Sequence, residues 1–126
     1  MAKKLVTVVV PMYNEEPMVP HFLTKIAEII KETDGYNFEV VAVNDGSRDN
    51  TLTLLYDFQK KYKFLRVVNL SRNFGHEAAV AAGLSVAKGD AIIPIDADLQ
   101  DPPELIKPML ELFEEGYDVV NARRAS

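Results

Sequence analysis

The chain has 126 residues, 48% of them hydrophobic, which is enough for one ordinary domain with a real core. Its 19 acidic residues outnumber its 14 lysines and arginines, and the formal net charge of -5 argues against nucleic acid as a partner. Cysteine is absent, which excludes disulfides and thiolate metal sites and fits a reducing, cytoplasmic location.

Short runs of β-branched residues alternate with longer segments of helical period along the whole chain. Strands are predicted over residues 5–10, 38–43, 65–70, 91–95 and 118–121. Most of these runs are continuously apolar, as expected of parallel strands that are covered on both faces. Pro94 cannot donate a hydrogen bond to a strand ladder, so we expect a bulge or a missing pairing partner there.

Helices are predicted between the strands, within residues 22–30, 55–62, 76–89 and 102–116. The third contains small residues that permit close approach to a sheet, and Gly89 is placed to end it. In the fourth, Pro108 should bend or divide the helix. This alternation predicts a single α/β domain with a three-layer, doubly wound, mostly parallel sheet, similar to a Rossmann-like nucleotide-binding half.

Polar loops follow the first four predicted strands, in the order "PMYNEE", "NDGSRDN", "SRNFGHE" and "DADLQDPPE". The carboxyl ends of parallel strands meet at one edge of the sheet, where ligands bind near the switch in strand order. Some of these residues have local explanations. Ser47 or Asp49 is expected to cap a helix, and Asp101 with Glu104 forms a capping box.

Asp96 and Asp98 precede that capping box, and residues two apart on an extended segment project to the same side. Two neighbouring carboxylates raise each other's pKa unless a cation lies between them. Gln100 follows at the next alternate position and supplies another oxygen. Oxygen ligands without His or Cys favour Mg²⁺ or Mn²⁺, so we expect these side chains to face a metal diphosphate.

Further candidates lie on the other loops of this edge. Asp45 and Glu15 could hold ribose hydroxyls or the N–H groups of a base, and Tyr13 either stacks on a base or packs under its loop. Arg72 and His76 flank the start of the third helix and could assist the phosphates. The alternatives are a surface ion pair for Arg72 and a solvent-facing position for His76.

The segments "VVVPMYNEE", "VNDGSRDNT", "LSRNFGHEAAVAAGL" and "DADLQDPPE" resemble, in order and spacing, family 2 glycosyltransferases of the GT-A fold. The similarity is to the polyprenyl-phosphate branch, which contains dolichyl-phosphate mannosyltransferases and bacterial undecaprenyl-phosphate glucosyltransferases. The resemblance implies inverting, metal-dependent transfer of a sugar from a nucleotide-diphospho-sugar, such as UDP-glucose, to a polyprenyl phosphate.

The resemblance also implies roles for single residues. Base and ribose would lie near Pro11, Tyr13, Glu15 and Asp45. Asp96 would face ribose or metal, Asp98 and Gln100 would hold the metal, and Arg72 would lie near the sugar or diphosphate. Asp98 and Arg72 are thus the candidate catalytic residues.

Members of the family continue into an acceptor-facing half, so we expect residues 1–126 to be a donor-binding domain truncated before it. Apolar surface left where that half would pack would allow a homo-oligomer. The full protein is expected at the cytoplasmic face of a membrane, although no stretch here approaches the roughly 18 apolar residues of a spanning helix.

Two alternatives remain open. One is a nucleotide-sugar binding fragment without turnover. The other is a Mg²⁺-dependent phosphoacceptor receiver domain, which needs an acceptor aspartate after the third strand, where this chain has "NLSRNFG".

Overall fold

The computed structural model describes residues 3–97 and 106–114 of the chain. Its strands are β1 (Lys4–Met12), β2 (Tyr36–Asn44), β3 (Leu65–Asn69) and β4 (Ala91–Pro94). Its helices are α1 (Met18–Glu32), α2 (Thr51–Lys61), α3 (His76–Val86) and α4 (Ile106–Glu114). The predicted α/β alternation is therefore confirmed, while the strand predicted at 118–121 lies outside the described residues.

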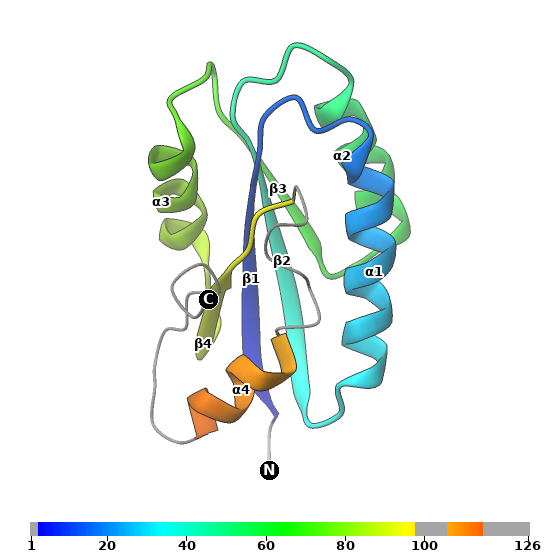
Figure 1. The fold of residues 1–126 in the computed structure, drawn as a ribbon, viewed down its shortest axis with the longest axis vertical. Helices are drawn as coiled ribbons and strands as arrows, with labels where there is room; N and C mark the ends of the chain where they lie inside the picture. Colours follow the sequence, from blue (N-terminus) through cyan, green and yellow to red (C-terminus); the bar gives the residue numbers. More distant parts are fainter. Residues whose placement is uncertain (1–2, 98–105, 115–126) are drawn as a thin grey trace.

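The strands form one parallel sheet in the order β3-β2-β1-β4 (Figure 1). The chain builds outward from β1 to β3 and then returns to place β4 on the other side of β1. The strand order thus reverses between β1 and β4, which is where sheets of this kind bind ligands. Within the described residues β4 pairs only with β1, and Pro94 lies opposite Val9. Since residues 98–105 and 115–126 are not described, the bulge or missing partner expected at Pro94 stays a prediction.

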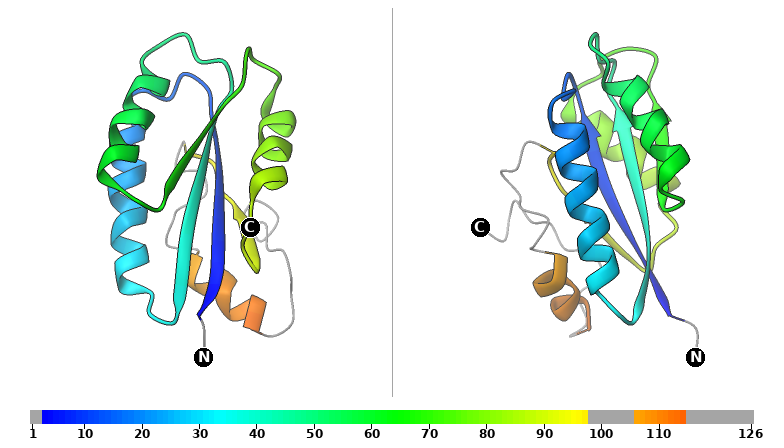
Figure 2. Two further views of the ribbon diagram at one scale, coloured as in Figure 1. Left: turned by 180° about the vertical axis from the view of Figure 1, so that it is seen from behind. Right: turned by 90° about the vertical axis from the view of Figure 1, so that its right-hand side faces the viewer.

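Helices cover both faces of the sheet (Figures 1 and 2). Helices α1 and α2 pack on one face, and buried side chains of α4 join the same core. Helix α3 packs on the other face. Side chains of β2 alternate between the two cores: Val40 and Ala42 lie in the larger one, and Val41 and Val43 lie against α3. The predicted three layers are confirmed.

Small residues bring α3 close to the sheet, as predicted. A Cβ on Gly83 would lie 2.4 Å from a methyl carbon of Val9, so only glycine fits there without a shift. The role predicted for Gly89 was wrong, because α3 ends at Val86. A Cβ on Gly89 would lie 2.6 Å from the backbone nitrogen of Thr7, so its small size serves the packing of the following turn against β1.

Helix α4 runs without interruption from Ile106 to Glu114. The division predicted at Pro108 is therefore absent from this segment, and the alternative of a bend stays a prediction. Among the helices described, none has the length and apolarity to cross a bilayer.

Candidate functional site

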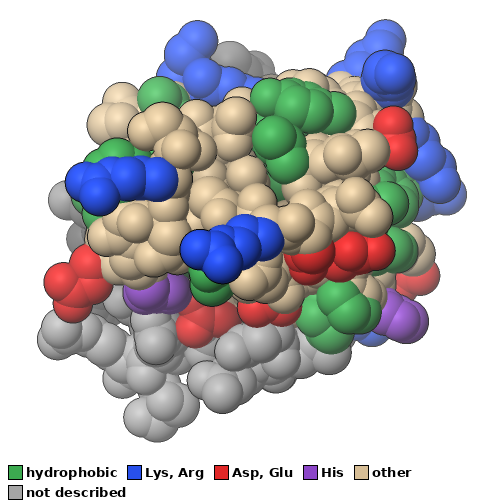
Figure 3. Space-filling view, turned by 90° about the horizontal axis from the view of Figure 1, so that it is seen from above, with side chains coloured by type: hydrophobic (Ala, Val, Ile, Leu, Met, Phe, Trp, Pro, Cys, Tyr) green, Lys and Arg blue, Asp and Glu red, His purple; other side chains and the backbone are tan. Residues whose placement is uncertain are grey.

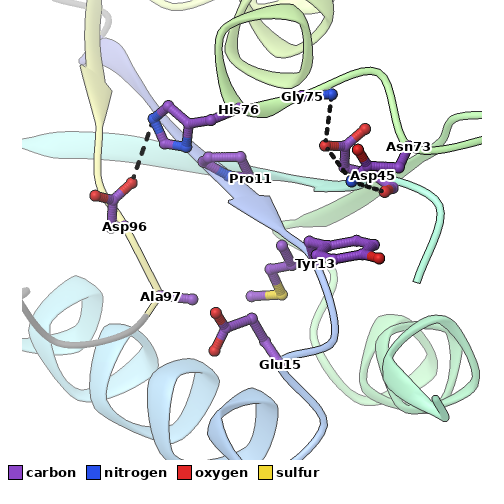
Figure 4. A pocket seen from close by; sticks show the side chains of 10 residues that line it. Pro11, Tyr13, Glu15, Asp45, Asn73, Gly75, His76, Asp96 and Ala97 are labelled. Carbon is purple, nitrogen blue, oxygen red and sulfur yellow. Dashed lines mark hydrogen bonds and ion pairs between the residues drawn. The ribbon is translucent and has the colours of Figure 1, made fainter. Parts of the chain in front are cut away.

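A cavity of about 530 Å³ opens at the carboxyl edge of the sheet, beside the reversal in strand order. The end of β1 and the loop after it contribute Pro11, Met12, Tyr13 and Glu15 (Figure 4). The segments that follow the other strands contribute Asp45, Asn73, Gly75, His76, Asp96 and Ala97. The structure therefore brings together six of the candidate residues: Pro11, Tyr13, Glu15, Asp45, His76 and Asp96.

Figure 3 shows this edge of the molecule from above. The acidic side chains gather mainly toward one side of the face, and most lysines and arginines lie toward the other. A ligand that carries phosphates would need a positive group among those carboxylates, because like charges repel at short range.

Asp45 is buried just after β2, and the loop before α3 binds its carboxylate. Oδ1 accepts a hydrogen bond from the backbone amide of Phe74 at 2.7 Å. Oδ2 accepts from the backbone amide of Gly75 at 3.1 Å and from the side-chain amide of Asn73 at 3.2 Å. Asp45 thus fixes the β3–α3 loop in addition to lining the cavity, a role that the sequence did not predict.

Gly46 lets the two loops approach closely enough for these bonds. Its φ of +71° lies in the left-handed region, which favours glycine. A Cβ at this position would lie 2.2 Å from the backbone nitrogen of Asn73. The glycine in "NDGS" is therefore required by both backbone conformation and space.

Asn14 joins the β1–α1 loop to the β2–α2 loop. Its backbone amide donates to Oγ of Ser47 at 2.9 Å, and its Oδ1 accepts from the backbone amide of Arg48 at 2.8 Å. Its φ of 52° is left-handed, which asparagine tolerates better than most residues. Tyr13 and Glu15, on either side of Asn14, both line the cavity, so this link fixes two site residues. Of the two residues expected to cap the helix, Ser47 or Asp49, Ser47 instead accepts a hydrogen bond from the neighbouring loop.

Asp49 ties the same two loops together and orders the start of α2. Its carboxylate accepts hydrogen bonds from the backbone amide of Thr51 at 3.0 Å, from the Thr51 hydroxyl, and from the backbone amide of Glu16 at 3.2 Å. Burial of Asp49 opposes its ionisation, but these bonds outweigh burial, and its pKa is lowered. The cap position itself is Asn50, whose side chain makes no capping bond, so Asp49 performs the predicted task from one residue earlier.

Asp96 and His76 face each other across one side of the cavity (Figure 4). Nε2 of His76 lies 3.6 Å from Oδ1 of Asp96. The Asp96 side chain is 14% exposed and that of His76 is 43% exposed. The solvent-facing position given as an alternative for His76 describes the residue only in part. Its side chain is half-exposed, and it also forms part of the cavity wall.

Tyr13 and Arg72 differ in their relation to the cavity. Tyr13 lines it and is 43% exposed, so the alternative that it packs under its loop was wrong. Arg72 is not among the lining residues, and its guanidinium carbon lies 4.5 Å from the centroid of the Phe74 ring, a cation–π contact. A contact between Arg72 and a phosphate stays a prediction.

Of the predicted metal ligands, only Asp96 belongs to the described residues; Asp98 and Gln100 lie outside them, as does Asp101. Within residues 3–97 and 106–114, no group of three His, Cys, Asp or Glu side chains is arranged to hold a metal ion. Asp96 does place a carboxylate on the cavity wall immediately before the segment with the other two oxygen donors. This donor chemistry fits a hard cation.

Sequence reasoning missed the links between loops because they join residues more than 25 positions apart. Asn73 had no local signal, since its partner Asp45 lies on another loop. Asn14 did have one: an asparagine directly after a strand often takes the left-handed conformation.

Comparisons with known proteins agree with this geometry. The model of the family described as Glycosyl transferase family 2 matches residues 7–126. An uncharacterised glycosyltransferase of Synechocystis sp. is 48% identical over 120 residues, which cover 95% of this chain and 37% of that protein. An undecaprenyl-phosphate 4-deoxy-4-formamido-L-arabinose transferase of Aeromonas hydrophila is 42% identical over 123 residues, 96% of this chain and 37% of that protein.

A prophage bactoprenol glucosyl transferase homolog of Escherichia coli is 42% identical over 120 residues, 95% of this chain and 39% of that protein. The chain thus spans less than two fifths of the length of these three relatives.

Two solved structures share the fold. A mannosyltransferase from Pyrobaculum calidifontis in complex with GDP-Man and Mn²⁺ has a TM-score of 0.67 and 29% identity, covering 78% of this chain and 28% of that one. TarS 1-349 of S. aureus in complex with UDP-GlcNAc has a TM-score of 0.68 and 28% identity, covering 90% of this chain and 32% of that one.

Proposed function

The chain belongs to glycosyltransferase family 2 and has the fold of GT-A glycosyltransferases, and from this we propose that it binds a nucleotide-diphospho-sugar and serves in transfer of the sugar to a polyprenyl phosphate. UDP-glucose or a similar sugar nucleotide is the proposed donor. The transfer is metal dependent and inverts the anomeric carbon. Residues 1–126 form the donor-binding part of the protein that performs it.

The observation that carries this proposal is the cavity at the reversal in strand order. It combines an exposed aromatic ring, Tyr13, with three carboxylates on separate loops, those of Glu15, Asp45 and Asp96. An aromatic ring can stack on a base, and carboxylates accept hydrogen bonds from ribose hydroxyls and base N–H groups. Two related structures hold nucleotide sugars, GDP-Man in one and UDP-GlcNAc in the other.

Asp45 can still accept a hydrogen bond from a nucleoside, although its carboxylate also holds the β3–α3 loop. An ionised carboxylate offers about four acceptor positions. The amides of Phe74 and Gly75 and the side chain of Asn73 use three of them. A single N–H of the base is therefore the contact proposed for Asp45, while Glu15 and Pro11 border the ribose.

Asp96, with Asp98 and Gln100, would hold Mg²⁺ or Mn²⁺. The ion would act as a Lewis acid that stabilises the departing nucleoside diphosphate. Mn²⁺ accompanies GDP-Man in the Pyrobaculum enzyme, which supports a divalent ion at the diphosphate. Arg72, in the loop that leads into His76 and α3, is proposed to approach the sugar or diphosphate from outside the cavity.

The reaction asks little of the protein as a base. A phosphate monoester has a second pKa near ~6, so the lipid phosphate is already largely an oxyanion at neutral pH. Its oxygen forms a bond to the anomeric carbon while the bond from that carbon to the β-phosphate oxygen breaks. The electron pair leaves with the nucleoside diphosphate. Attack from the face opposite the leaving group inverts the centre, so the site must mainly align the two reactants.

The names of two relatives support the acceptor, since one is an undecaprenyl-phosphate transferase and another a bactoprenol glucosyl transferase homolog. Polyprenyl phosphates reside in membranes, which leads us to propose the cytoplasmic face of a membrane as the place of reaction. Membership in family 2 leaves the receiver-domain alternative without support.

A thermal-shift screen tests the donor. UDP, GDP and CDP sugars are added with Mn²⁺ and with a chelator. A uridine nucleotide is expected to raise the melting temperature, and Asp98→Ala is expected to remove the metal-dependent part. If neither the chelator nor that substitution changes the stabilisation, the assignment of the acidic loop is wrong.

Transfer of labelled glucose from UDP-glucose to undecaprenyl phosphate then separates an enzyme from a binding fragment. Binding with transfer supports the full proposal. Binding without transfer or hydrolysis supports the alternative, a nucleotide-sugar binding unit without turnover.

A further inference from the structure

We propose that His76 is a donor-binding residue that contacts the diphosphate of the nucleotide sugar through its Nε2 atom. This inference rests on the proposed function and assigns a specific contact to a residue that the sequence offered only as a candidate. The contact is a hydrogen bond from the ring N–H to a phosphate oxygen, which a neutral imidazole can make as well as a protonated one.

The position of His76 is fixed by the loop that precedes it. His76 is the first residue of α3, and the amide of the neighbouring Gly75 donates to the buried carboxylate of Asp45 at 3.1 Å. The φ of 103° at Gly75 turns the chain into the helix at this point. The imidazole is thus presented to the cavity by a backbone that two strands hold in place, which limits the entropy lost when a ligand binds.

The charge of the cavity favours a hydrogen-bond donor at this place. Its lining includes the carboxylates of Glu15, Asp45 and Asp96. Among the described lining residues, His76 is the one with a basic side chain, and none is lysine or arginine. A diphosphate brings further negative charge into this wall. A divalent ion would offset part of the repulsion, and an N–H donor would bind an oxygen that the ion does not.

The geometry also indicates which part of the ligand His76 contacts, namely the diphosphate. Figure 4 shows Tyr13 and Asp45 on one side of the cavity and His76 with Asp96 on the other. A base stacked on Tyr13 directs the diphosphate toward Asp96. Since Nε2 of His76 lies 3.6 Å from Oδ1 of Asp96, a phosphate bound beside Asp96 comes within reach of the imidazole.

A different role is that His76 only positions Asp96 and never contacts the ligand. The two roles differ in their effect on a nucleoside without phosphates. A phosphate contact affects UDP and leaves uridine unchanged. A residue that orients a ribose-binding carboxylate affects both, and one that orients a metal ligand affects UDP only while the metal ion is present.

Calorimetry with UDP and with uridine, each with Mn²⁺ and with a chelator, distinguishes the two roles in His76→Ala, His76→Gln and His76→Asn, because a direct phosphate contact weakens UDP binding in both conditions. His76→Ala is expected to weaken UDP binding by about tenfold or more, the usual effect of losing a hydrogen bond to a charged group, and to leave uridine within about twofold. The amide nitrogen of glutamine can occupy the place of Nε2, so His76→Gln should keep most of the UDP affinity. Asparagine is too short to reach it and should behave like alanine.

The matched control is His21→Ala, since His21 is an exposed histidine on α1 that does not line the cavity. It should bind UDP as the unmodified chain does. Equal UDP affinity in His76→Ala and the unmodified chain overturns the inference, as does an equal loss for UDP and uridine or a loss for UDP that is seen with Mn²⁺ and not with the chelator. Failure of the unmodified chain to bind UDP would instead contradict the proposed function itself.

Discussion

Glu39 is a buried carboxylate that stabilises the sheet at the edge away from the site. It accepts hydrogen bonds from the Thr7 hydroxyl at 2.6 Å, the backbone amide of Lys88 at 2.8 Å and the guanidinium of Arg66 at 2.9 Å. Desolvation by burial raises the pKa of Glu39, but the bonds from Thr7, Lys88 and Arg66 and the charge of Arg66 outweigh it, so its pKa is lowered. One side chain thereby links three strands and the α3–β4 turn.

Replacing this charge should make the chain less stable at neutral pH and less sensitive to acid. Glu39→Gln keeps the shape but turns an N–H donor toward Arg66, and we expect the free energy of unfolding to fall by about 1–3 kcal/mol near pH 7. Because the pKa of Glu39 is lower in the folded chain, its contribution is present above the unfolded pKa of about 4.3 and is lost as pH falls through the folded value. The gap between variant and parent should therefore shrink toward about pH 3.

Urea unfolding at both pH values measures this gap. Glu28→Gln is the control, because Glu28 is exposed on α1, and it should change stability little at either pH. An equal gap at neutral and acid pH would mean that the charge of Glu39 contributes nothing.

Asn14 combines two effects that substitution can separate. Asn14→Ala loses the bond from the Arg48 amide and also forces a Cβ-bearing, non-amide residue into the left-handed region. Asn14→Gly loses the same bond without the backbone strain. We expect the alanine variant to be less stable than the glycine variant by about 1 kcal/mol, as measured by chemical denaturation. Equal stabilities would show that the φ of 52° costs alanine nothing.

At the scale of elements, the fold follows from local patterns. Apolar runs predicted each described strand to within about two residues at either end, because parallel strands buried on both faces need such runs. The polar loops also placed the site on the correct edge. The start of α1 at Met18 was missed by four residues, since its first turn carries no acidic residue and no side-chain cap.

Contacts between loops could not be predicted in the same way. The bonds of Asn14 to the β2–α2 loop and of Asp45 to the β3–α3 loop depend on which strands become neighbours. Turn-forming residues such as Ser47 have a local use that competes with any such partner. His76 was undervalued for the same reason, because only the sheet order places it opposite Asp96.

Gly46 lets the loops that follow β2 and β3 approach each other closely. Matched substitutions at Gly46 and Gly35 test this role. Gly46→Ala should strain the backbone and push Asn73 away, and we expect the free energy of unfolding to fall by about 2–4 kcal/mol. Gly35 has a φ of +96° but no atom within 4 Å of an added Cβ, so Gly35→Ala should cost only the strain, about 1–2 kcal/mol. Chemical denaturation measures the free energy of unfolding of both variants.

The two glycine variants should differ even more in ligand binding. Gly46→Ala moves the loop that carries His76 and should weaken UDP binding, whereas Gly35 lies in a turn before β2, at the opposite edge, and its variant should keep the affinity. Retained UDP affinity in Gly46→Ala would contradict the idea that this glycine orders the site.

At the scale of the whole molecule, the sheet separates two edges with different tasks. At the carboxyl edge, Asp45, Asn14 and Asp49 link the loops to one another, and these loops surround the cavity. At the amino edge, the turns between helices and strands are anchored to the sheet, as Lys88 and Gly89 are through Glu39 and Thr7. A ligand at the carboxyl edge should therefore change the dynamics of one edge alone.

Hydrogen exchange with and without UDP and Mn²⁺ tests this separation. Binding stabilises the loops that contact the ligand and those bonded to them, so their amides should exchange more slowly. Protection is expected in residues 11–16, 45–50 and 71–76 and not in the turns at 33–35, 62–64 and 87–90. The loop at 45–50 is the sharpest part of the prediction, because apart from Asp45 none of its residues lines the cavity and its protection must come through Asn14, Glu16 and Asp45. Protection that spreads equally to both edges would mean that the ligand tightens the whole fold, and that the bonds between loops do not confine its effect to the site.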